Sequence, residues 1–284
     1  MGTLFLVATP IGHLEDVTLR ALRVLREAEL VLAEDTRRTR ILLDRYTIAA
    51  RPVSLHAHNE AARIARVLAV LEAGGSAALV SDAGTPLVSD PGERLVAAAI
   101  AAGHAVVAVP GASAVLAALS VAGLPTVHFA FAGFLPRRAR ERDAWLQAWR
   151  DREETLVLFE SPRRLAATLL RLLEILGDRP ACVARELSKL HEEVARGSLG
   201  SLATKFSTGT RGEVTIVVGG RLRETAASAA PDLDAAIRAG LASGESTRAL
   251  ATRLSVQCGV SRREIYGRAL AVRDGRGVRP DRGS

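Results

Sequence analysis

The chain has little cysteine, almost no lysine and no long apolar run among its 284 residues. Its two cysteines, Cys182 and Cys258, lie far apart and form no CxxC pattern, so a reducing compartment, the cytoplasm, is the simplest expectation. No stretch of about 18 uncharged apolar residues occurs, and we therefore expect no membrane span. The apolar start, Met1–Ile11, lacks a basic lead and is followed by charged residues, which favours a first strand over a signal peptide.

Several common catalytic motifs are also missing: GxxxxGK[ST], GxGxxG, HExxH and GxSxG do not occur. The missing phosphate loop counts against a nucleotide-binding phosphotransferase. His56 and His58 form a single HxH pair, but a metal site needs three or four ligands, so we expect no metal. A surface or substrate-facing position is the simpler interpretation of this pair.

Basic residues outnumber acidic ones and give a formal net charge of +7. Apart from Lys189 and Lys205, every Lys or Arg position holds arginine. Such a balance favours an anionic partner, with nucleic acid as the first candidate. Arginine and alanine this abundant are also what a GC-rich genome produces, so both explanations of the charge stay open.

Short apolar runs alternate with amphipathic stretches in the first part of the chain. The amphipathic stretches repeat their apolar residues at helical spacing, and Gly74-Gly75 is a typical helix stop. The expected strands are Leu4–Ala8, Leu30–Ala33, Pro52–Leu55, Ala77–Ser81 and Ala105–Val109. The expected helices are Leu14–Ala28, Thr36–Tyr46, Glu60–Ala73 and Glu93–Ala102. This alternation predicts an α/β fold with a mostly parallel sheet covered by helices on both faces.

A boundary near Gly123-Leu124-Pro125 separates a second pattern, which predicts a mixed α/β domain. Its expected strands are Val127–Ala132, Thr155–Phe159, Ala181–Arg185, Glu192–Arg196 and Glu213–Val218, and its expected helices are Arg137–Arg150 and Pro162–Leu176. After them we expect a linker, three helices and a disordered end at Arg223–Pro231, Asp232–Ala242, Ser246–Cys258, Ser261–Val272 and Asp274–Ser284. The predicted domains are therefore 1–122, 123–222 and a small helical domain, 232–274.

Three loops rich in Gly and Pro follow strands of the first predicted sheet. They are Thr9–Gly12, Asp82–Pro86 and Pro110–Ala114, and Asp90-Pro91-Gly92 comes soon after the second. Small residues let backbone groups approach a ligand, and ligands of open α/β sheets bind at the carboxyl ends of strands. One such loop alone would be an ordinary turn with a helix cap such as Ser113. Three loops at one edge of one sheet predict a ligand crevice.

Four polar clusters also begin where predicted strands end. They are Glu34–Thr39, Ser54–Glu60, Glu160–Arg164 and Arg185–Lys189. Helix capping by Thr36, Asn59 and Ser161, together with solvation of the charges, explains part of this pattern. It does not explain why Arg, Glu and His gather at the same ends. Arginine can fork onto phosphates, which suits an RNA backbone.

In these loops and clusters the chain resembles the ribosomal RNA small-subunit methyltransferase I group of the tetrapyrrole methylase superfamily. The resemblance runs in order, without a large gap, from about Leu4 to Val272. AEDTRRT together with SDAGTPLVSDPG is specific to this group, whereas PGAS alone is weak. His13 departs from the group, which usually carries Asn after TPIG, and the departure affects the hydrogen bonding of that loop. The matching stretches are LFLVATPIGHLEDVTLRAL, AEDTRRTRILL, SLHAHNE, ALVSDAGTPLVSDPGERLV, VPGASAVLAALSVAGLP, FAGFLPR, FESPRRL, RELSKLHEEVARGSL and RGEVTIVVGG.

The resemblance implies a two-domain, tetrapyrrole-methylase-like fold that binds S-adenosylmethionine between its domains. Members of the group transfer the methyl to the 2′-hydroxyl of a cytidine in the decoding region of 16S ribosomal RNA, in the small ribosomal subunit, and they act as homodimers. The three loops and the resemblance together assign the cofactor to Pro10, Asp82, Gly84, Thr85, Pro86, Ser113 and Ala114.

Methyl transfer from a sulfonium requires chiefly that the nucleophile be aligned with the methyl. The ribose hydroxyl must also lose its proton, and Glu34, Asp35 and His56 are the candidate acceptors. For the two acids, a salt bridge to one of the neighbouring arginines is an equally good structural explanation. The residues expected to hold the RNA, with the arginines facing the cofactor cleft, are Arg37, Arg163, Arg185 and Lys189.

The last two predicted helices have helix–turn–helix spacing. They would dock on RNA, or they would form a cap on the body or on a second subunit, and both stay open. Two other functions fit the sequence less well. A sister methyltransferase acting on a small tetrapyrrole or a protein side chain is disfavoured by the EDTR cluster, the arginine-rich cleft edge and the helical tail. A non-enzymatic nucleic-acid-binding regulator would leave the three loops without a purpose.

Overall fold

The computed structural model describes residues 2–56, 59–221, 233–258 and 260–273. The chain divides into two compact units, Met1–Arg221 and Leu222–Ser284. The predicted linker, Arg223–Pro231, and the predicted disordered end, Asp274–Ser284, lie outside the described residues. The first unit contains two five-stranded sheets. Its division into two domains at residue 122 stays a prediction.

The first sheet is fully parallel and has the strand order β3-β2-β4-β1-β5. Its strands are β1 (Thr3–Val7), β2 (Leu30–Ala33), β3 (Val53–Ser54), β4 (Ser76–Val80) and β5 (Ala105–Val109). Leu6 of β1 pairs with Leu79 of β4 and Ala108 of β5. Parallel strands end at one edge of the sheet, so the loops after β1, β4 and β5 are neighbours. The predicted parallel sheet is confirmed.

Helices cover both faces of this sheet, as expected for strands whose side chains alternate between the faces. The helices are α1 (Leu19–Glu27), α2 (Thr36–Arg45), α3 (Glu60–Glu72) and α4 (Glu93–Ala101). Val7 and Val80 belong to the core formed with α1 and α2, whereas Leu4 and Leu79 belong to the core formed with α3 and α4. Near-continuous burial along β2 and β4 follows from this two-sided cover.

The predicted helix Leu14–Ala28 is wrong over its first turn. A short 3-10 helix, Leu14–Asp16, comes first, and the residues after it are extended. The hydroxyl of Thr18 accepts a hydrogen bond from the N–H of Ala21 at 3.1 Å, so Thr18 caps a helix that begins only at Leu19. The apolar spacing continues through both segments and therefore does not reveal the break.

The second sheet is mixed, with the order β6-β7-β10-β8-β9. Its strands are β6 (Phe129–Phe134), β7 (Thr155–Glu160), β8 (Pro180–Arg185), β9 (Glu193–Ser198) and β10 (Val214–Val218). The central strand, β10, is antiparallel to both β7 and β8, while β6 is parallel to β7. This arrangement confirms the predicted mixed α/β character of the second half of the unit.

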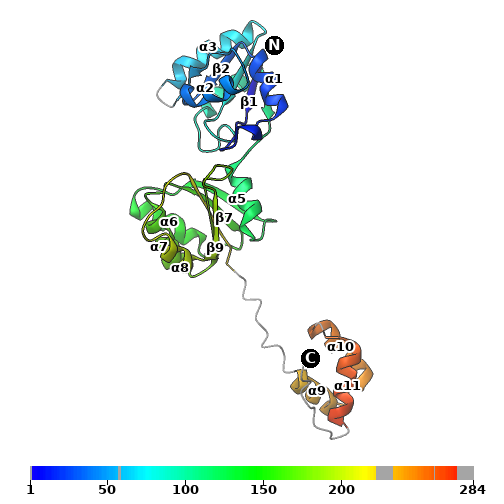
Figure 1. Ribbon diagram of the computed structural model, residues 1–284. Coiled ribbons are helices and arrows are strands. Elements are labelled where there is room, and N and C mark those ends of the chain that lie inside the picture. Colours follow the sequence, from blue (N-terminus) through cyan, green and yellow to red (C-terminus); the bar gives the residue numbers. More distant parts are fainter. Residues whose placement is uncertain (1, 57–58, 222–232, 259, 274–284) are drawn as a thin grey trace. The chain divides into compact units, whose positions relative to one another are not determined.

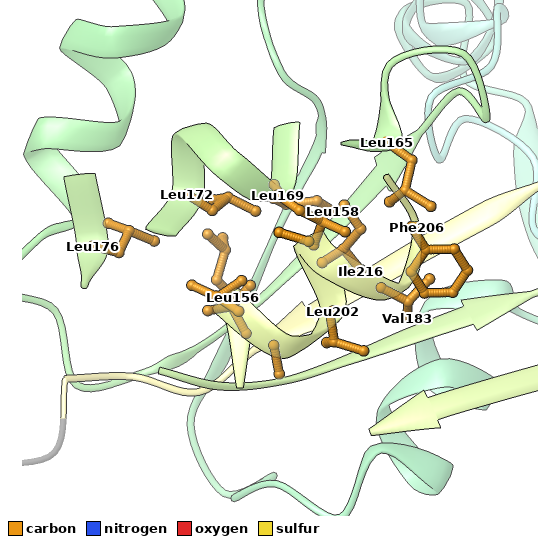
Figure 2. Close-up of a cluster of buried hydrophobic side chains, with 14 of the residues drawn as sticks. Leu156, Leu158, Leu165, Leu169, Leu172, Leu176, Val183, Leu202, Phe206 and Ile216 are labelled. Carbon is orange, nitrogen blue, oxygen red and sulfur yellow. The ribbon is translucent and has the colours of Figure 1, made fainter. Parts of the chain in front are cut away.

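Helices also cover both faces of the second sheet. They are α5 (Ala114–Ala122), α6 (Ala139–Trp149), α7 (Leu165–Leu176) and α8 (Leu199–Lys205). Figure 2 shows Leu169 and Leu172 of α7 in one cluster with Leu156 and Leu158 of β7. α5 packs on the opposite face, where its Leu119 joins the core that contains residues of β7, β8 and β10. α5 therefore follows a strand of the first sheet and packs on the second.

One sequence prediction for this half is wrong, and one helix was not predicted. The helix expected from Pro162 begins at Leu165, because Ser161–Arg164 form a turn. In this turn the carbonyl of Ser161 accepts hydrogen bonds from the N–H groups of Arg164 and Leu165, at 3.0 and 3.2 Å. The short helix α8 was not predicted at all.

The second unit consists, over its described residues, of three helices: α9 (Leu233–Ala242), α10 (Thr247–Cys258) and α11 (Arg262–Arg273) (Figure 1). Their contact is a small apolar core built from Ile237, Leu250, Ala251, Leu254, Ile265 and Ala269. Of the helices in the described part of the chain, none is both long enough and apolar enough to cross a membrane.

Candidate functional site

The three Gly/Pro loops of the first sheet are hydrogen-bonded to one another. The N–H of Thr9 donates to the carbonyl of Gly84 at 2.9 Å, and the N–H of Gly84 donates back at 3.0 Å. The hydroxyl of Thr85 donates to the carbonyl of Ala112, in the third loop, at 3.3 Å. Gly84 has a φ of +95°, a conformation that a residue with a side chain rarely adopts. The predicted convergence of these loops at one edge of the sheet is thus a feature of the fold.

The second loop, which follows β4, is held by side chains as well as backbone. The hydroxyl of Thr9 donates to the carbonyl of Ser81 at 2.9 Å. The hydroxyl of Ser81 in turn donates to Asp90 and accepts from the N–H of Ala83. Leu87 and Ser89 have positive φ angles, 71° and 69°, which cost free energy for residues with side chains. This fixed loop turns Asp90 back toward the end of β4.

A cleft of about 410 Å³ lies in the first unit at the edge where these loops meet. Residues in and beside the strands of both sheets line it. From the first sheet and its loops come Ile11, Glu34, Arg38, Asp82, Ala83, Val88, Ser89 and Asp90. From α5, the second sheet and its loops come Ala114, Phe134, Phe159, Glu160, Ser161, Pro162, Ala184, Leu187, Gly212, Glu213, Val214 and Thr215. The cleft therefore combines apolar walls with a set of carboxylates.

Three of these carboxylates, on Glu34, Asp82 and Asp90, interact electrostatically. Partial desolvation raises the pKa of Glu34 above its usual 4.5, the charges of Asp82 and Asp90 raise it further, and Arg38 opposes the shift. Burial also raises the pKa of Asp90, with a hydrogen bond from Ser81 opposing and Asp82 adding to the shift. The cleft thus contains carboxylates that take up a proton more readily than isolated ones.

The residues assigned to the cofactor from sequence fall into two groups. Asp82 and Ala114 line the cleft. The others lie in the same three loops but are not among its lining residues: Pro10, Gly84, Thr85, Pro86 and Ser113. Ser113 is the N-cap of α5 and accepts from the N–H of Leu116 at 3.5 Å, so its predicted capping is confirmed.

The three candidate proton acceptors lie in different surroundings. Glu34 lines the cleft. Asp35 caps α2, and its carboxylate is held by two hydrogen bonds from the Arg37 guanidinium, which keep the pKa of Asp35 well below its usual range. His56 follows β3, where its backbone N–H donates to the Asn59 side chain at 2.8 Å, and it is not a lining residue of the cleft.

None of the four residues expected to hold RNA is among the lining residues of the cleft. Arg37 is 89% exposed and paired with Asp35. Arg163 is exposed at the start of the turn before α7. The other two form ion pairs, Arg185 with Glu193 at 3.1 Å and Lys189 with Glu186 and Glu213 at 2.8 and 3.0 Å. Whether these four contact RNA stays a prediction.

Sequence reasoning did not single out several residues of the site. Asp90 belongs to a loop that was noted for its Gly and Pro, not for its acid. Arg38 reaches Glu213 at 3.6 Å and so connects residues that follow β2 and precede β10. Glu160 ends β7 with a side chain only 1% exposed. The signal available for Glu160 was its place in the FESPRRL stretch, but nothing in that stretch shows burial.

Within the described part of the chain, no group of three or more His, Cys, Asp or Glu side chains is arranged to hold a metal ion. The carboxylates of the cleft are accompanied by Arg38. What the cleft offers chemically is a set of acids with raised pKa beside apolar surface, and this combination suits a cationic organic ligand and a proton transfer.

The chain matches known proteins over most of its length. Residues 3–203 match the family model of Tetrapyrrole (Corrin/Porphyrin) Methylases. The chain is 44% identical over 274 residues to the ribosomal RNA small subunit methyltransferase I of Mesorhizobium japonicum, which covers 95% of this chain and 92% of that protein. It is 50% identical over 223 residues to the protein of the same name from Mycobacterium tuberculosis, over 77% of this chain and 78% of that one.

Solved structures share the fold. A uroporphyrin-III C-methyltransferase from Thermus thermophilus is 29% identical, with a TM-score of 0.54 over 77% of this chain and 94% of that one. Diphthine synthase is 18% identical, with a TM-score of 0.62 over 77% of this chain and 90% of that one, and it shows the fold alone. From the family match and the relatives at 44 and 50% identity it follows that the chain belongs to the tetrapyrrole methylase family, in its ribosomal RNA small subunit methyltransferase I group.

Proposed function

We propose that this protein transfers a methyl group from S-adenosylmethionine to the 2′-hydroxyl of a cytidine in the decoding region of 16S ribosomal RNA. One observation carries the proposal: the match to the Mesorhizobium ribosomal RNA small subunit methyltransferase I extends over 95% of the chain and so includes most of the second unit as well as the cleft. The methyl donor is S-adenosylmethionine, as membership of this methylase group implies.

The cleft fits such a donor in size and chemistry. Its volume, about 410 Å³, lies within the range of small-molecule sites. Ile11, Val88 and Phe159 supply apolar surface for a purine, and the carboxylates of Asp82 and Glu34 suit ribose hydroxyls and positive charge. When bound, the donor supplies an electrophilic methyl on a sulfonium. The protein has to hold the acceptor hydroxyl in line and exclude water.

Glu34 is the residue that we propose as proton acceptor. It lines the cleft, and its raised pKa makes its carboxylate a better base than an isolated glutamate. Asp35 is engaged by Arg37, which lowers its proton affinity, and His56 does not line the cleft. These two remain weaker candidates for the same role. The ribose proton would pass to a carboxylate oxygen of Glu34 during or after methyl transfer.

The substrate side of the proposal rests on the basic residues. Arg37, Arg163, Arg185 and Lys189 would contact the RNA of the small subunit, together with the net charge of +7. We also propose that the protein acts in the cytoplasm as a homodimer. The Ala-rich apolar helices offer surface for a shared face.

The deciding experiment maps 2′-O-methyl groups on small-subunit RNA from cells with and without this gene. One cytidine in the decoding region is expected to lose its methyl when the gene is deleted. Purified protein with labelled S-adenosylmethionine should then restore the methyl on isolated small subunits. An unchanged methylation map, or methyl transfer to a tetrapyrrole and not to RNA, would contradict the proposal.

A further inference from the structure

We propose that a groove beside the cleft binds one phosphate of the RNA backbone, with Arg163 and Arg211 as its two cations. The groove has a volume of about 670 Å³ and lies between the turn before α7 and the turn after α8. Its lining residues are Pro162, Arg163, Ala166, Ser207, Thr208, Gly209, Thr210 and Arg211. This inference rests on the proposed function, which identifies the bound polymer as RNA. It adds a phosphate-binding site that the proposed function does not specify.

The two arginines of the groove are free to bind an anion. Both are exposed, and among the described residues no hydrogen bond or ion pair engages either guanidinium. Among the described residues that line the groove, none is acidic. The hydroxyls of Thr208 and Thr210 add potential hydrogen-bond donors. A guanidinium forks onto phosphate oxygens, and two of them on opposite walls surround one phosphate. The chemistry of the groove therefore selects a phosphate.

On the first wall of the groove, which is the turn before α7, the adjacent residues Arg163 and Arg164 have different roles. The carboxylate of Glu160 accepts from the N–H of Ser161 and the hydroxyl of Thr168, both at 2.7 Å. Arg164 turns inward, lies 3.4 Å from Glu160 and donates to the carbonyl of Leu135 at 3.1 Å. These contacts fix the turn. The neighbouring Arg163 takes no part in them and points to solvent.

The second wall has a matching arrangement. Phe206 is buried and anchors the turn, and Gly209 has a φ of +84° that lets the chain reverse. Arg185 donates to the backbone carbonyl of Arg211 at 3.2 Å while also pairing with Glu193. Arg185 thus acts on the turn, and Arg211, through its side chain, is the cation that this turn presents. Figure 2 shows Leu165 and Phe206, which follow and precede the two turns, in one buried cluster.

The groove and the cleft share a wall. Pro162 lines both, and Gly212, the residue after Arg211, lines the cleft. An RNA strand whose target ribose enters the cleft would therefore place a neighbouring phosphate at the groove. Contacts to phosphate position the polymer without reading its sequence. The groove would then set which ribose of the strand reaches the methyl group.

The test compares Arg163→Ala, Arg211→Ala and the double variant with wild type, and uses Arg51→Ala as control. Arg51 is exposed and lies before β3, at the edge of the first sheet opposite the cleft. Affinity for isolated small ribosomal subunits is measured across a salt series. Each groove variant should bind roughly tenfold more weakly and lower the slope of log affinity against log salt by about one. The proposal requires both guanidiniums together to hold the one phosphate, so loss of either releases it. The double variant should therefore also lose about one unit of slope, not two.

Two results would overturn the proposal. One is a salt slope that stays at the wild-type value in both single variants, and the other is a loss of about two units in the double variant. Calorimetry with inorganic phosphate distinguishes binding of the RNA from binding of a free anion. If the double variant no longer binds phosphate but keeps its affinity for small subunits, the assignment of the groove to RNA is refuted. Failure of the wild type to methylate small subunits would contradict the proposed function alone, because the groove is tested by binding.

Discussion

The backbone N–H of Asp35 donates a hydrogen bond to the Asp82 side chain, with 2.8 Å between nitrogen and Oδ1. The two residues are separated by 47 positions and follow neighbouring strands, β2 and β4. This bond connects the AEDT stretch to the SDAG stretch, which are the two most specific sequence features of the chain. It also fixes one carboxylate oxygen of Asp82, a residue that lines the cleft.

Asp82 can be tested with a pair of substitutions. Asp82→Ala removes the acceptor of the Asp35 N–H and should lower the free energy of unfolding by about 1 kcal/mol or more. Asp82→Asn keeps an acceptor oxygen, so its stability should stay near wild type while its affinity for S-adenosylhomocysteine falls. Urea denaturation and calorimetry measure the two effects. Equal stability in Asp82→Ala and wild type would show that the bond between the loops contributes nothing.

For Glu34 we predict a loss of rate. Glu34→Gln should reduce kcat by at least about 100-fold, because it removes the proposed proton acceptor. The matched control is Glu27→Gln, an exposed change at the end of α1. Methyl transfer at saturating cofactor and small subunits is the measurement, and wild-type kcat in Glu34→Gln would assign the proton to another acceptor.

The raised pKa of Glu34 also predicts a pH dependence of stability. A carboxyl whose folded pKa lies above its unfolded value stabilises the fold at low pH, and that contribution is lost as pH rises through the folded pKa. Glu34→Gln should therefore melt above wild type at pH 7, and the difference should vanish below the ordinary pKa of 4.5. Thermal melts at several pH values test this, with Glu27→Gln again as control. A difference in Tm that does not change with pH would be inconsistent with the raised pKa of Glu34 as its cause.

Arg185 and Arg163 should respond differently to substitution. Arg185→Ala removes a contact to Glu193 and one to the carbonyl of Arg211, so it should cost about 1–2 kcal/mol of stability. Arg163→Ala should leave the unfolding midpoint at the wild-type value, since its side chain has no partner among the described residues. Urea titrations of both variants provide the comparison. A stability loss in Arg163→Ala equal to that of Arg185→Ala would contradict this division.

The homodimer is tested without mutation. Light scattering across micromolar concentrations should report a mass twice that of the 30.0 kDa chain. A monomer at every concentration measured would refute the dimer. The cleft of a single chain would then have to suffice for activity.

Much of the fold was predictable because its signals are local. The strands Leu30–Ala33 and Ala105–Val109 were predicted to the residue, since each is a short apolar run bounded by clear turns. The start of α1 and the start of α7 were missed, because both depend on caps and turns that apolar spacing does not encode. α8 was missed because it is a single short helix between β9 and the turn that follows it.

The candidate site was predictable in its loops and less so in its side chains. The three loops meet because parallel strands end together, and that follows from the β–α alternation. Which charges face the cleft depends on pairing between distant residues. The sequence does not show, for example, that Arg185 pairs with Glu193, the residue facing it across β8 and β9.

The central position of β10 has a consequence for synthesis of the protein. Of the strands in the described residues, β10 is the last to leave the ribosome, yet it separates β7 from β8. Until Val218 has emerged, the second sheet has two open inner edges, and the cleft lacks the wall formed by Val214 and Thr215. A nascent chain that stops before this point could complete its first sheet but would lack part of the proposed methyl-transfer site. Activity therefore switches on only when almost the whole first unit has been translated.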